Sequence, residues 1–266
     1  MKKIECNFKD WKWPFYIHDN GDYLSGKLVN KTHGGPGTWE PVHTSKVVEI
    51  LKKGDVAIDM GANMGWYTTI MAKCVGSIGS VVSIEPSTEN FEVLSENIKL
   101  NDLSCVKLIN KAAGNEKKII KLSRPKIINY GDTRIYNPGD SHEEANEIEM
   151  IDVDSLLKEL SIEKSKVRFV KIDCQGAEPY ILDGMKETID SLTPGACILL
   201  EIWPESWLQQ NLVLDYVFKN IKNKFDILDD DMKTSISWEK LEETCKAAYE
   251  KNRNKLSGFD ILLIKK

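Results

Sequence analysis

The feature that most constrains the fold is an alternation between short, continuously apolar runs and longer segments with helical periodicity. The first run, Val-Ala-Ile-Asp-Met at 56–60, ends in Gly61, and a helical pattern over 64–75 follows it. A strand that is apolar on both faces is typical of the interior of a parallel sheet. The alternation therefore predicts a mostly parallel sheet with helices on both faces.

Seven segments have the character of strands: 55–61, 81–86, 106–111, 168–173, 197–203, 225–228 and 259–264. The segments between them are predicted as helices: 44–53, 64–75, a helix with Ser87 as its N-cap, 154–160, 178–192, 205–221, and a charged helix whose apolar face holds Trp238, Leu241, Cys245 and Tyr249. We therefore expect an α/β, doubly wound, mostly parallel sheet of seven strands.

Two segments do not fit this alternation. Residues 1–43 are rich in Trp, Gly and Pro, and we interpret them as an N-terminal lid or extension to a main domain over 44–266. Residues from about 114 to 150 contain prolines, turn signals and short β-like pieces, which indicates an inserted β arm. The charged helix, over about 236–252, is a further addition to the alternating pattern.

Composition excludes several classes of partner. With 36 basic and 41 acidic residues the net charge is −5, and four of the basic residues are Arg, so we expect no nucleic-acid or membrane partner. The six cysteines form no C-x-x-C pair, as is typical of reduced thiols. The N-terminal residues lack the apolar core of a signal peptide, and no segment is apolar enough to span a membrane. We therefore expect a cytoplasmic protein.

A candidate binding motif lies where ligands bind in open α/β sheets, beyond the carboxyl ends of the strands. The first strand ends in Asp59-Met-Gly61-Ala-Asn63-Met-Gly65, whose glycines allow a tight turn and a close approach to a ligand. The second strand ends in Glu85, 26 residues after Asp59. An acidic residue at this place can accept hydrogen bonds from the two hydroxyls of a ribose. A cofactor that contains a nucleoside is therefore predicted.

The type of cofactor follows from what the motif lacks. A dinucleotide fingerprint requires G-x-G-x-x-G, but here Asn63 and Trp66 replace two of the glycines, and no P-loop string occurs. The spacing D-x-G-x-N-x-G suits a cofactor without a pyrophosphate, in which Asp59 faces an ammonium group and the turn packs against a methionine chain and a ribose. S-adenosylmethionine fits this description.

The sequence resembles the FkbM family of S-adenosylmethionine-dependent methyltransferases, which have a class I, Rossmann-like methyltransferase sheet. The matching strings are VAIDMGANMGWYT (56–68), SIEPSTENFEVLSENIKLN (83–101), KAAGN (111–115), FVKIDCQGAEPYILDGM (169–185) and LLEIWPE (199–205). One departure is Cys174-Gln175, where the family commonly has an apolar residue and Glu. This difference could alter the substrate side of the pocket.

The resemblance implies roles for individual residues. The cofactor-binding residues that it implies are Glu40, Asp59, Gly61, Ala62, Asn63, Gly65, Glu85, Pro86, Ser87, Ala113 and Asp173. Asp173 and Glu201 end predicted strands and His33 flanks the lid, so these three are the candidates for an orienting or basic catalytic group. Asp173, Glu178 and Glu201 could alternatively gather Mg²⁺, because all three supply carboxylate oxygens. The sequence neither supports nor excludes this metal, and Glu178 also suits the start of a helix.

The resemblance also implies the reaction, which is O-methylation of a hydroxyl group on a sugar, a glycan or another secondary metabolite. We therefore expect a small-molecule or glycan acceptor, whereas the oligomeric state stays open. Two alternatives remain at this point. One is a nucleotide-cofactor oxidoreductase of the NAD type on a similar sheet, and the other is a protein that binds S-adenosylmethionine without catalysis.

Overall fold

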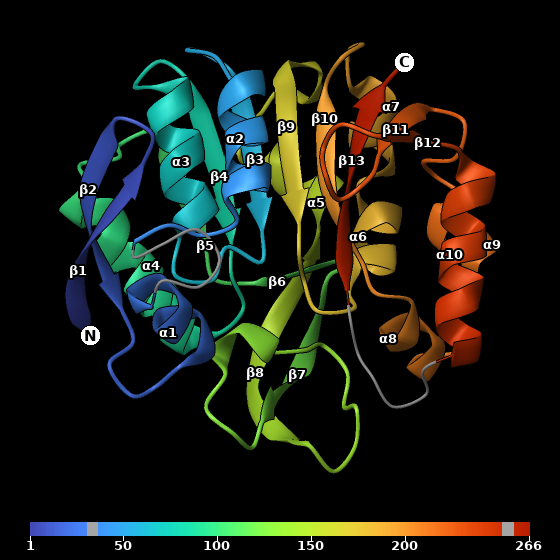
Figure 1. Ribbon diagram of the computed structural model, residues 1–266, viewed down its shortest axis with the longest axis horizontal. Helices are drawn as coiled ribbons and strands as arrows, with labels where there is room; N and C mark the ends of the chain where they lie inside the picture. Colours follow the sequence, from blue (N-terminus) through green and yellow to red (C-terminus); the bar gives the residue numbers. More distant parts are fainter. Residues whose placement is uncertain (31–36, 252–257) are drawn as a thin grey trace.

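The computed structural model describes residues 1–30, 37–251 and 258–266, without the side chains of 249–251. Its centre is an eight-stranded sheet with the order β12-β11-β13-β10-β9-β3-β4-β5 (Figure 1). The strands are β3 Val56–Met60, β4 Ser80–Ile84, β5 Val106–Ile109, β9 Val167–Ile172, β10 Cys197–Ile202, β11 Phe225–Leu228, β12 Ser235–Ile236 and β13 Phe259–Lys265. The doubly wound, mostly parallel α/β fold is thereby confirmed.

The strand count is one higher than predicted. Ser235 and Ile236 pair antiparallel with Leu228 and Ile227, and so add the short edge strand β12 to the seven expected strands. Two consecutive residues carry no periodicity, so the sequence offers no signal for such a strand. The five strands from β10 to β5 run parallel, and β13 inserts antiparallel between β10 and β11.

Each face of the sheet has its own hydrophobic core. Ile58 and Met60 of β3 point to one core, and Ala57 between them points to the other, as the two-residue period of a strand requires. The first core is covered by α5 Val153–Glu159, α6 Glu178–Gly184, α7 Lys186–Ser191, α8 Pro204–Gln209, α9 Leu214–Phe218 and α10 Trp238–Lys251. The second core is covered by α2 Pro41–Ile50 and α3 Trp66–Val75.

Most predicted helices are present, but some bounds and two lengths were wrong. Helix α2 begins three residues earlier than expected, because Pro41 suits the first turn of a helix. Helix α4, Thr88–Leu100, begins as predicted after Ser87, whose hydroxyl accepts the N–H of Asn90 at 3.3 Å. The expected helix over 178–192 is divided at Met185, and that over 205–221 is divided between Gln209 and Leu214. The predicted place of Tyr249 on the apolar face of α10 lies outside the described side chains.

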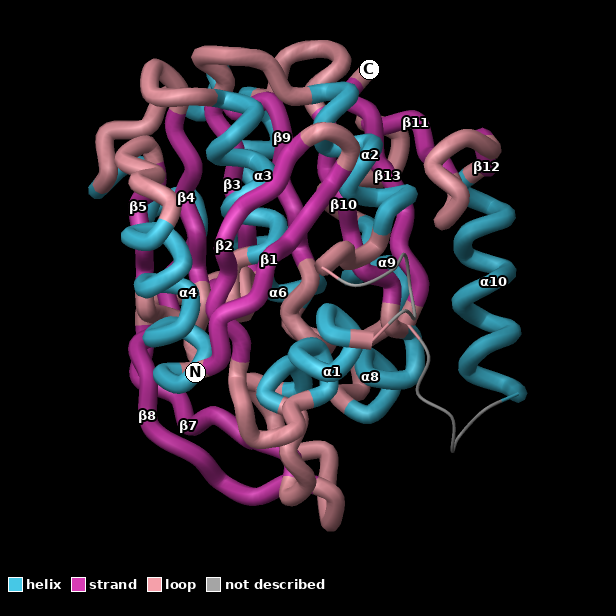
Figure 2. Tube along the Cα trace, turned by 60° about the vertical axis from the view of Figure 1, so that its left-hand side comes forward, coloured by secondary structure: helices cyan, strands magenta, loops and turns pink. Residues whose placement is uncertain are grey.

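The N-terminal segment and the inserted arm form two small sheets that are separate from the main sheet. Strands β1 Lys2–Phe8 and β2 Trp11–Ile17 form an antiparallel hairpin, which α1 Tyr23–Val29 follows. The arm is a second sheet of three strands in the order β6-β8-β7, with bounds Ala112–Gly114, His142–Asp152 and Lys118–Pro125. Figures 1 and 2 show β7 and β8 below the main sheet, on the side of α1. No helix within the described ranges is long and apolar enough to cross a membrane.

Candidate active site

A cavity of about 390 Å³ lies at the carboxyl ends of β3, β4 and β9. This is the edge at which open α/β sheets bind ligands, and the volume is in the range of small-molecule sites. Its floor comes from the residues that end these strands, and its walls come from α1, Trp39 and the arm residues 129–135. The N-terminal segment and the arm therefore enclose a site that the main sheet presents.

The turn after β3 forms one side of the cavity floor. Gly61 has a φ of 79°, and a Cβ atom at this position would lie 1.8 Å from the carbonyl oxygen of Asp173, so only glycine fits here. Asn63 is also left-handed, with a φ of 51°. Asp59 is buried, and its Oδ2 accepts the hydroxyl of Thr68 at 2.6 Å. Its Oδ1 has no hydrogen-bond partner among the described residues, so this oxygen is available to a donor on a ligand.

Glu85 lies next to this turn, at the end of β4. Its carboxylate accepts the backbone N–H of Asn63 at 2.7 Å and that of Ser87 at 2.9 Å. Burial raises the pKa of Glu85 to about 7, although both amides oppose this shift. Each carboxylate oxygen has a second lone pair, so Glu85 can hold the turn and still accept two hydroxyl groups from the cavity.

The other residues predicted to bind the cofactor divide into two groups. Ala62, Pro86, Ala113 and Asp173 line the cavity together with Asp59, Gly61, Asn63 and Glu85. Three others have positions behind its wall. Gly65 precedes α3 with a φ of 93°, Ser87 caps α4, and Glu40 accepts the hydroxyl of Tyr67 at 2.6 Å. His33 lies outside the described residues.

An ion pair between Lys171 and Asp173 lies at the end of β9. Lys171 is 3% exposed, its Nζ is 2.6 Å from Oδ2 of Asp173, and it also lies 4.7 Å from the centre of the Tyr67 ring. Although burial opposes ionisation, Lys171 lowers the pKa of Asp173, which is therefore a charged acceptor on the cavity wall. Sequence analysis did not single out Lys171, whose signal is a lone charge within the apolar string Phe-Val-Lys-Ile.

Gln175 joins Asp173 to Glu201, the second predicted catalytic carboxyl group. Its Nε2 donates to Oδ1 of Asp173 at 3.0 Å and to Oε2 of Glu201 at 3.4 Å. Burial and the nearby carboxylates of Asp173 and Glu178 raise the pKa of Glu201 well above its usual range. Gln175 therefore brings the two carboxyl groups together, at a position where this chain departs from the resembled family.

Glu178 belongs to the structural framework. Its Oε1 accepts the backbone N–H groups of Cys174 and Gly176, at 2.9 and 3.0 Å, and its Oε2 accepts Nε1 of Trp207 at 3.1 Å. The side chain is buried and directed at the turn before α6. These contacts agree with the interpretation of Glu178 as a helix-start residue and leave it poorly placed to share Mg²⁺ with Asp173 and Glu201.

The arm contributes two residues that sequence analysis missed. The backbone N–H of Tyr130 donates to Asp22 at 2.9 Å, and Asn90 donates to the carbonyl of Tyr130 at 3.0 Å, which joins the arm to α1 and α4. Arg134 is buried, pairs with Asp132 at 2.6 Å, and lies 4.6 Å from the centre of the Trp203 ring. The sequence does contain one indication of Arg134, because arginine is rare in this chain and each arginine is therefore conspicuous.

Comparison with known proteins identifies one family. The sequence model of the family described as the methyltransferase FkbM domain matches residues 59–206, which is more than half of the chain. These residues include the end of β3, the turn after it, Glu85, the arm, Asp173 and Glu201. No protein among the curated sequences matches the chain significantly.

Solved structures of methyltransferases are also similar to this chain, at low sequence identity. An rRNA methylase from Streptococcus thermophilus is 12% identical with a TM-score of 0.48, over 84% of this chain and 93% of that one. A methyltransferase FkbM from Methylobacillus flagellatus is 14% identical with a TM-score of 0.46, over 84% of this chain and 51% of that one. An O-methyltransferase from Bacillus cereus, in complex with SAH, is 14% identical with a TM-score of 0.45, over 86% and 83%. Likenesses this low carry no conclusion about the acceptor.

Proposed function

Because the chain belongs to the FkbM methyltransferase domain family and is an S-adenosylmethionine-dependent methyltransferase, we propose that it methylates a hydroxyl oxygen of a sugar, a glycan or another small metabolite. The family establishes the cofactor and the class of reaction. The oxygen acceptor and its chemical class are the proposal, and the geometry at the end of β9 supports them.

The residues present fit the cofactor. Asp59 offers a buried carboxylate oxygen without a partner, which suits the ammonium of a methionine moiety. Glu85 has free lone pairs for two ribose hydroxyls. Gly61 lets the turn after β3 lie against the backbone of Asp173, which brings the two strand ends together at the cavity. When bound, S-adenosylmethionine supplies an activated methyl group on a sulfonium. The surplus of carboxyl groups around the cavity suits that positive charge.

The Asp173 carboxylate is the observation that carries the proposal. It lies on the cavity wall, and Lys171 and Gln175 hold it in place as a charged acceptor. A hydroxyl group that donates to Asp173 is oriented by this bond, and the Asp173 carboxylate accepts its proton as the oxygen takes the methyl group. Methyl transfer otherwise depends on alignment of the acceptor oxygen, which an enclosed cavity provides. Lys171 is a positioning residue in this scheme.

The remaining walls of the cavity support a sugar-like acceptor. Tyr23, Trp39, Tyr130 and Trp203 line it, and these aromatic side chains combine apolar faces with polar edges. Such faces can pack against the C–H surface of a sugar ring while the edges bind its hydroxyl groups. A cavity of about 390 Å³ also suits a small molecule or the end of a glycan better than a large, flat surface.

Transfer of a labelled methyl group tests the proposal. We expect the wild-type protein to move label from S-adenosylmethionine to members of a panel of sugars and hydroxylated metabolites. Asp173→Asn is expected to lower this rate by roughly 10²- to 10⁴-fold, the usual range for a lost general base. Asp183→Asn is the matched control, because Asp183 pairs with Lys219 away from the cavity.

Calorimetry separates the other outcomes. S-adenosylmethionine and its demethylated product should bind, and NAD should not. Full activity of Asp173→Asn would contradict its role as an acceptor for the hydroxyl proton. Cofactor binding with no transfer to any hydroxylated compound, but with transfer to amines, would contradict the proposal of an oxygen acceptor.

A further inference from the structure

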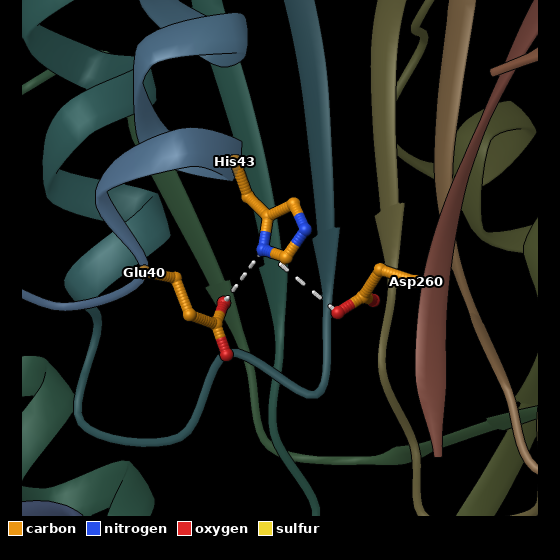
Figure 3. A group of neighbouring side chains, drawn as sticks. All are labelled: Glu40, His43 and Asp260. Atoms are coloured by element: carbon orange, nitrogen blue, oxygen red, sulfur yellow. Dashed lines mark ion pairs between the residues drawn. The ribbon is translucent and has the colours of Figure 1, made fainter. Parts of the chain in front are cut away.

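Glu40, His43 and Asp260 form a second polar group outside the cavity wall. Glu40 immediately precedes α2, His43 lies in the first turn of α2, and Asp260 lies in β13. Nδ1 of His43 is 3.9 Å from Oε2 of Glu40 and 3.9 Å from Oδ2 of Asp260, and all three atoms lie within 4.8 Å of one another. Figure 3 shows the two carboxylates on either side of Nδ1. All three side chains are half-buried.

The hydrogen bonds of His43 determine which ring nitrogen carries its proton. Nε2 faces the carbonyl oxygen of Asp230 at 3.1 Å and the carboxylate of the same residue at 3.3 Å. Both are acceptors, so Nε2 must be the donor, and in a neutral imidazole Nδ1 then carries a lone pair. This lone pair points at two carboxyl groups, which in their ionised form also have only lone pairs to offer. Three acceptors therefore face one another, and Nδ1 is buried without a hydrogen-bond partner among the described residues.

The spacing of the three atoms fits a cation better than a proton. At 3.9 Å, the nitrogen and each carboxylate oxygen are too far apart for a hydrogen bond, so a second proton on the ring would still leave both contacts long. Donor atoms around a tetrahedral ion with bonds of about 2.1 Å are separated by roughly 3.4 Å. To close around a metal ion, each nitrogen–oxygen separation would shorten by about 0.5 Å, and the separation of the two carboxylate oxygens, which is at most 4.8 Å, would shorten by up to about 1.4 Å.

The charge around the group also calls for a cation. Tyr67 donates to Glu40, but no positively charged side chain is paired with Glu40 or Asp260, apart from His43 itself, in the part of the chain that the structure describes. The nearby Lys171 is already paired with Asp173 at 2.6 Å. The two carboxylates therefore share no cationic partner of their own beyond an imidazole whose proton faces the other way.

We propose that Glu40, His43 and Asp260 form a binding site for a divalent transition-metal ion such as Zn²⁺. One imidazole and two carboxylates are a common ligand set for such ions, and three protein ligands leave a position for water. Asp230 is the outer partner of the site. It accepts Nε2–H of His43 and the backbone N–H of Asp260, and such bonds commonly orient metal-ligating groups.

The bound ion would fasten the N-terminal segment to the main sheet. Glu40 has a φ of 40°, an unfavourable backbone conformation for a residue with a side chain, so something must hold it there. Its neighbour Trp39 lines the cavity, as does Tyr67, which donates to Glu40. The ion would therefore fix two parts of the cavity wall from outside without touching the ligands within it.

Titration of the full-length, metal-free protein with Co²⁺ tests this site, with no methyl donor or acceptor present. We expect one equivalent to bind with visible absorption bands, and Zn²⁺ to displace it. His43→Gln and Asp260→Asn should each weaken Co²⁺ binding at least tenfold, and Asp230→Asn should weaken it less. His18→Gln is the matched control, because His18 bonds Asn90 at 3.0 Å, away from the group, and it should bind as the wild type does.

Three results would overturn the proposal. The first is the absence of stoichiometric binding to the wild-type protein, and the second is unchanged affinity in both His43→Gln and Asp260→Asn. The third is the intense near-ultraviolet band of a Co²⁺–thiolate complex, which would locate the ion at a cysteine. A thermal melt of each variant shows that it is folded. Because binding is measured without methyl transfer, failure of this site and failure of the proposed reaction are distinguishable.

Discussion

At the scale of single residues, the cavity contains two carboxyl groups whose ionisation is set in opposite directions. Burial raises the pKa of Glu85 to about 7. Lys171 lowers the pKa of Asp173 in spite of burial. Near neutral pH Glu85, which is proposed to bind the ribose, therefore titrates. Asp173, which is proposed to bind the acceptor hydroxyl, stays charged. The two ends of the cavity should respond differently to acid.

This difference gives a prediction for cofactor binding. A protonated Glu85 accepts hydroxyl donors poorly, so affinity for S-adenosylmethionine should fall as the pH decreases from 8 to 6. If only the ionised form binds, one pH unit below its pKa leaves about a tenth of the molecules competent, which weakens apparent affinity about tenfold. Calorimetry at both pH values measures this affinity. The affinity of Glu85→Gln for S-adenosylmethionine should be low and independent of pH. The half-buried neighbour Glu89, which faces Arg124 outside the cavity, is the control, and Glu89→Gln should behave as the wild type. A pH response in Glu85→Gln equal to that of the wild type would refute the assignment.

At the scale of elements, a tertiary contact lies at the point where one predicted helix divides. The periodicity of 178–192 indicates one apolar face, but the chain bends at Met185. Gly184, before the bend, packs so closely on the arm strand β6 that a Cβ atom would lie 1.9 Å from the carbonyl oxygen of Gly114. Helical periodicity reports which side of a helix is buried and not how near another backbone approaches.

Substitution of Gly184 tests this contact. Gly184→Ala should destabilise the protein by about 1–3 kcal/mol, as is usual when a well-packed site is overfilled. Gly26→Ala is the matched control, because a Cβ atom on Gly26 within α1 would meet nothing within 4 Å. Alanine there should be neutral or stabilise by about 0.5–1 kcal/mol, since glycine is unfavourable within a helix. Thermal unfolding of both variants measures this, and equal melting temperatures would show that the contact is not tight.

At the scale of the whole molecule, buried acidic groups gather at one edge of the main sheet. Besides Glu85, Asp260 has a pKa raised to about 7, by burial first and then by the carboxylate of Glu40. The ordinary values for these two groups are 4.5 and 3.8. Between these values and pH 7 the folded protein holds protons that the unfolded chain releases. Their contribution to stability is therefore complete below pH 4 and is lost as the pH rises through 7.

The unliganded protein should accordingly unfold at a lower temperature at pH 8 than at pH 6. Asp173 does not reverse this trend, because its lowered pKa affects stability only in more acidic solution. A melting temperature lower by a few degrees at pH 8 is expected for a chain of this size. The double variant Glu85→Gln, Asp260→Asn should show a smaller difference. A wild-type melting temperature that rises from pH 6 to pH 8 would contradict the shifts.

The sequence by itself determined the parallel sheet and the part of the site carried by its strand ends. Asp59, Gly61, Asn63, Glu85 and Asp173 were predicted because short-range order fixes their places: each ends a buried strand or follows one within a few residues. Such strands are recognised from their own apolar residues, and parallel strands must end at the same edge.

The tertiary structure decided everything that depends on contacts between distant segments. Lys171 against Tyr67, Tyr130 against Asp22, and the group of Glu40, His43 and Asp260 each join residues far apart in the chain. No local spacing marks such partners, because side chains that meet through folding need no fixed separation in sequence. The same reason explains the eighth strand and the helix divided at Met185, where one backbone packs against another.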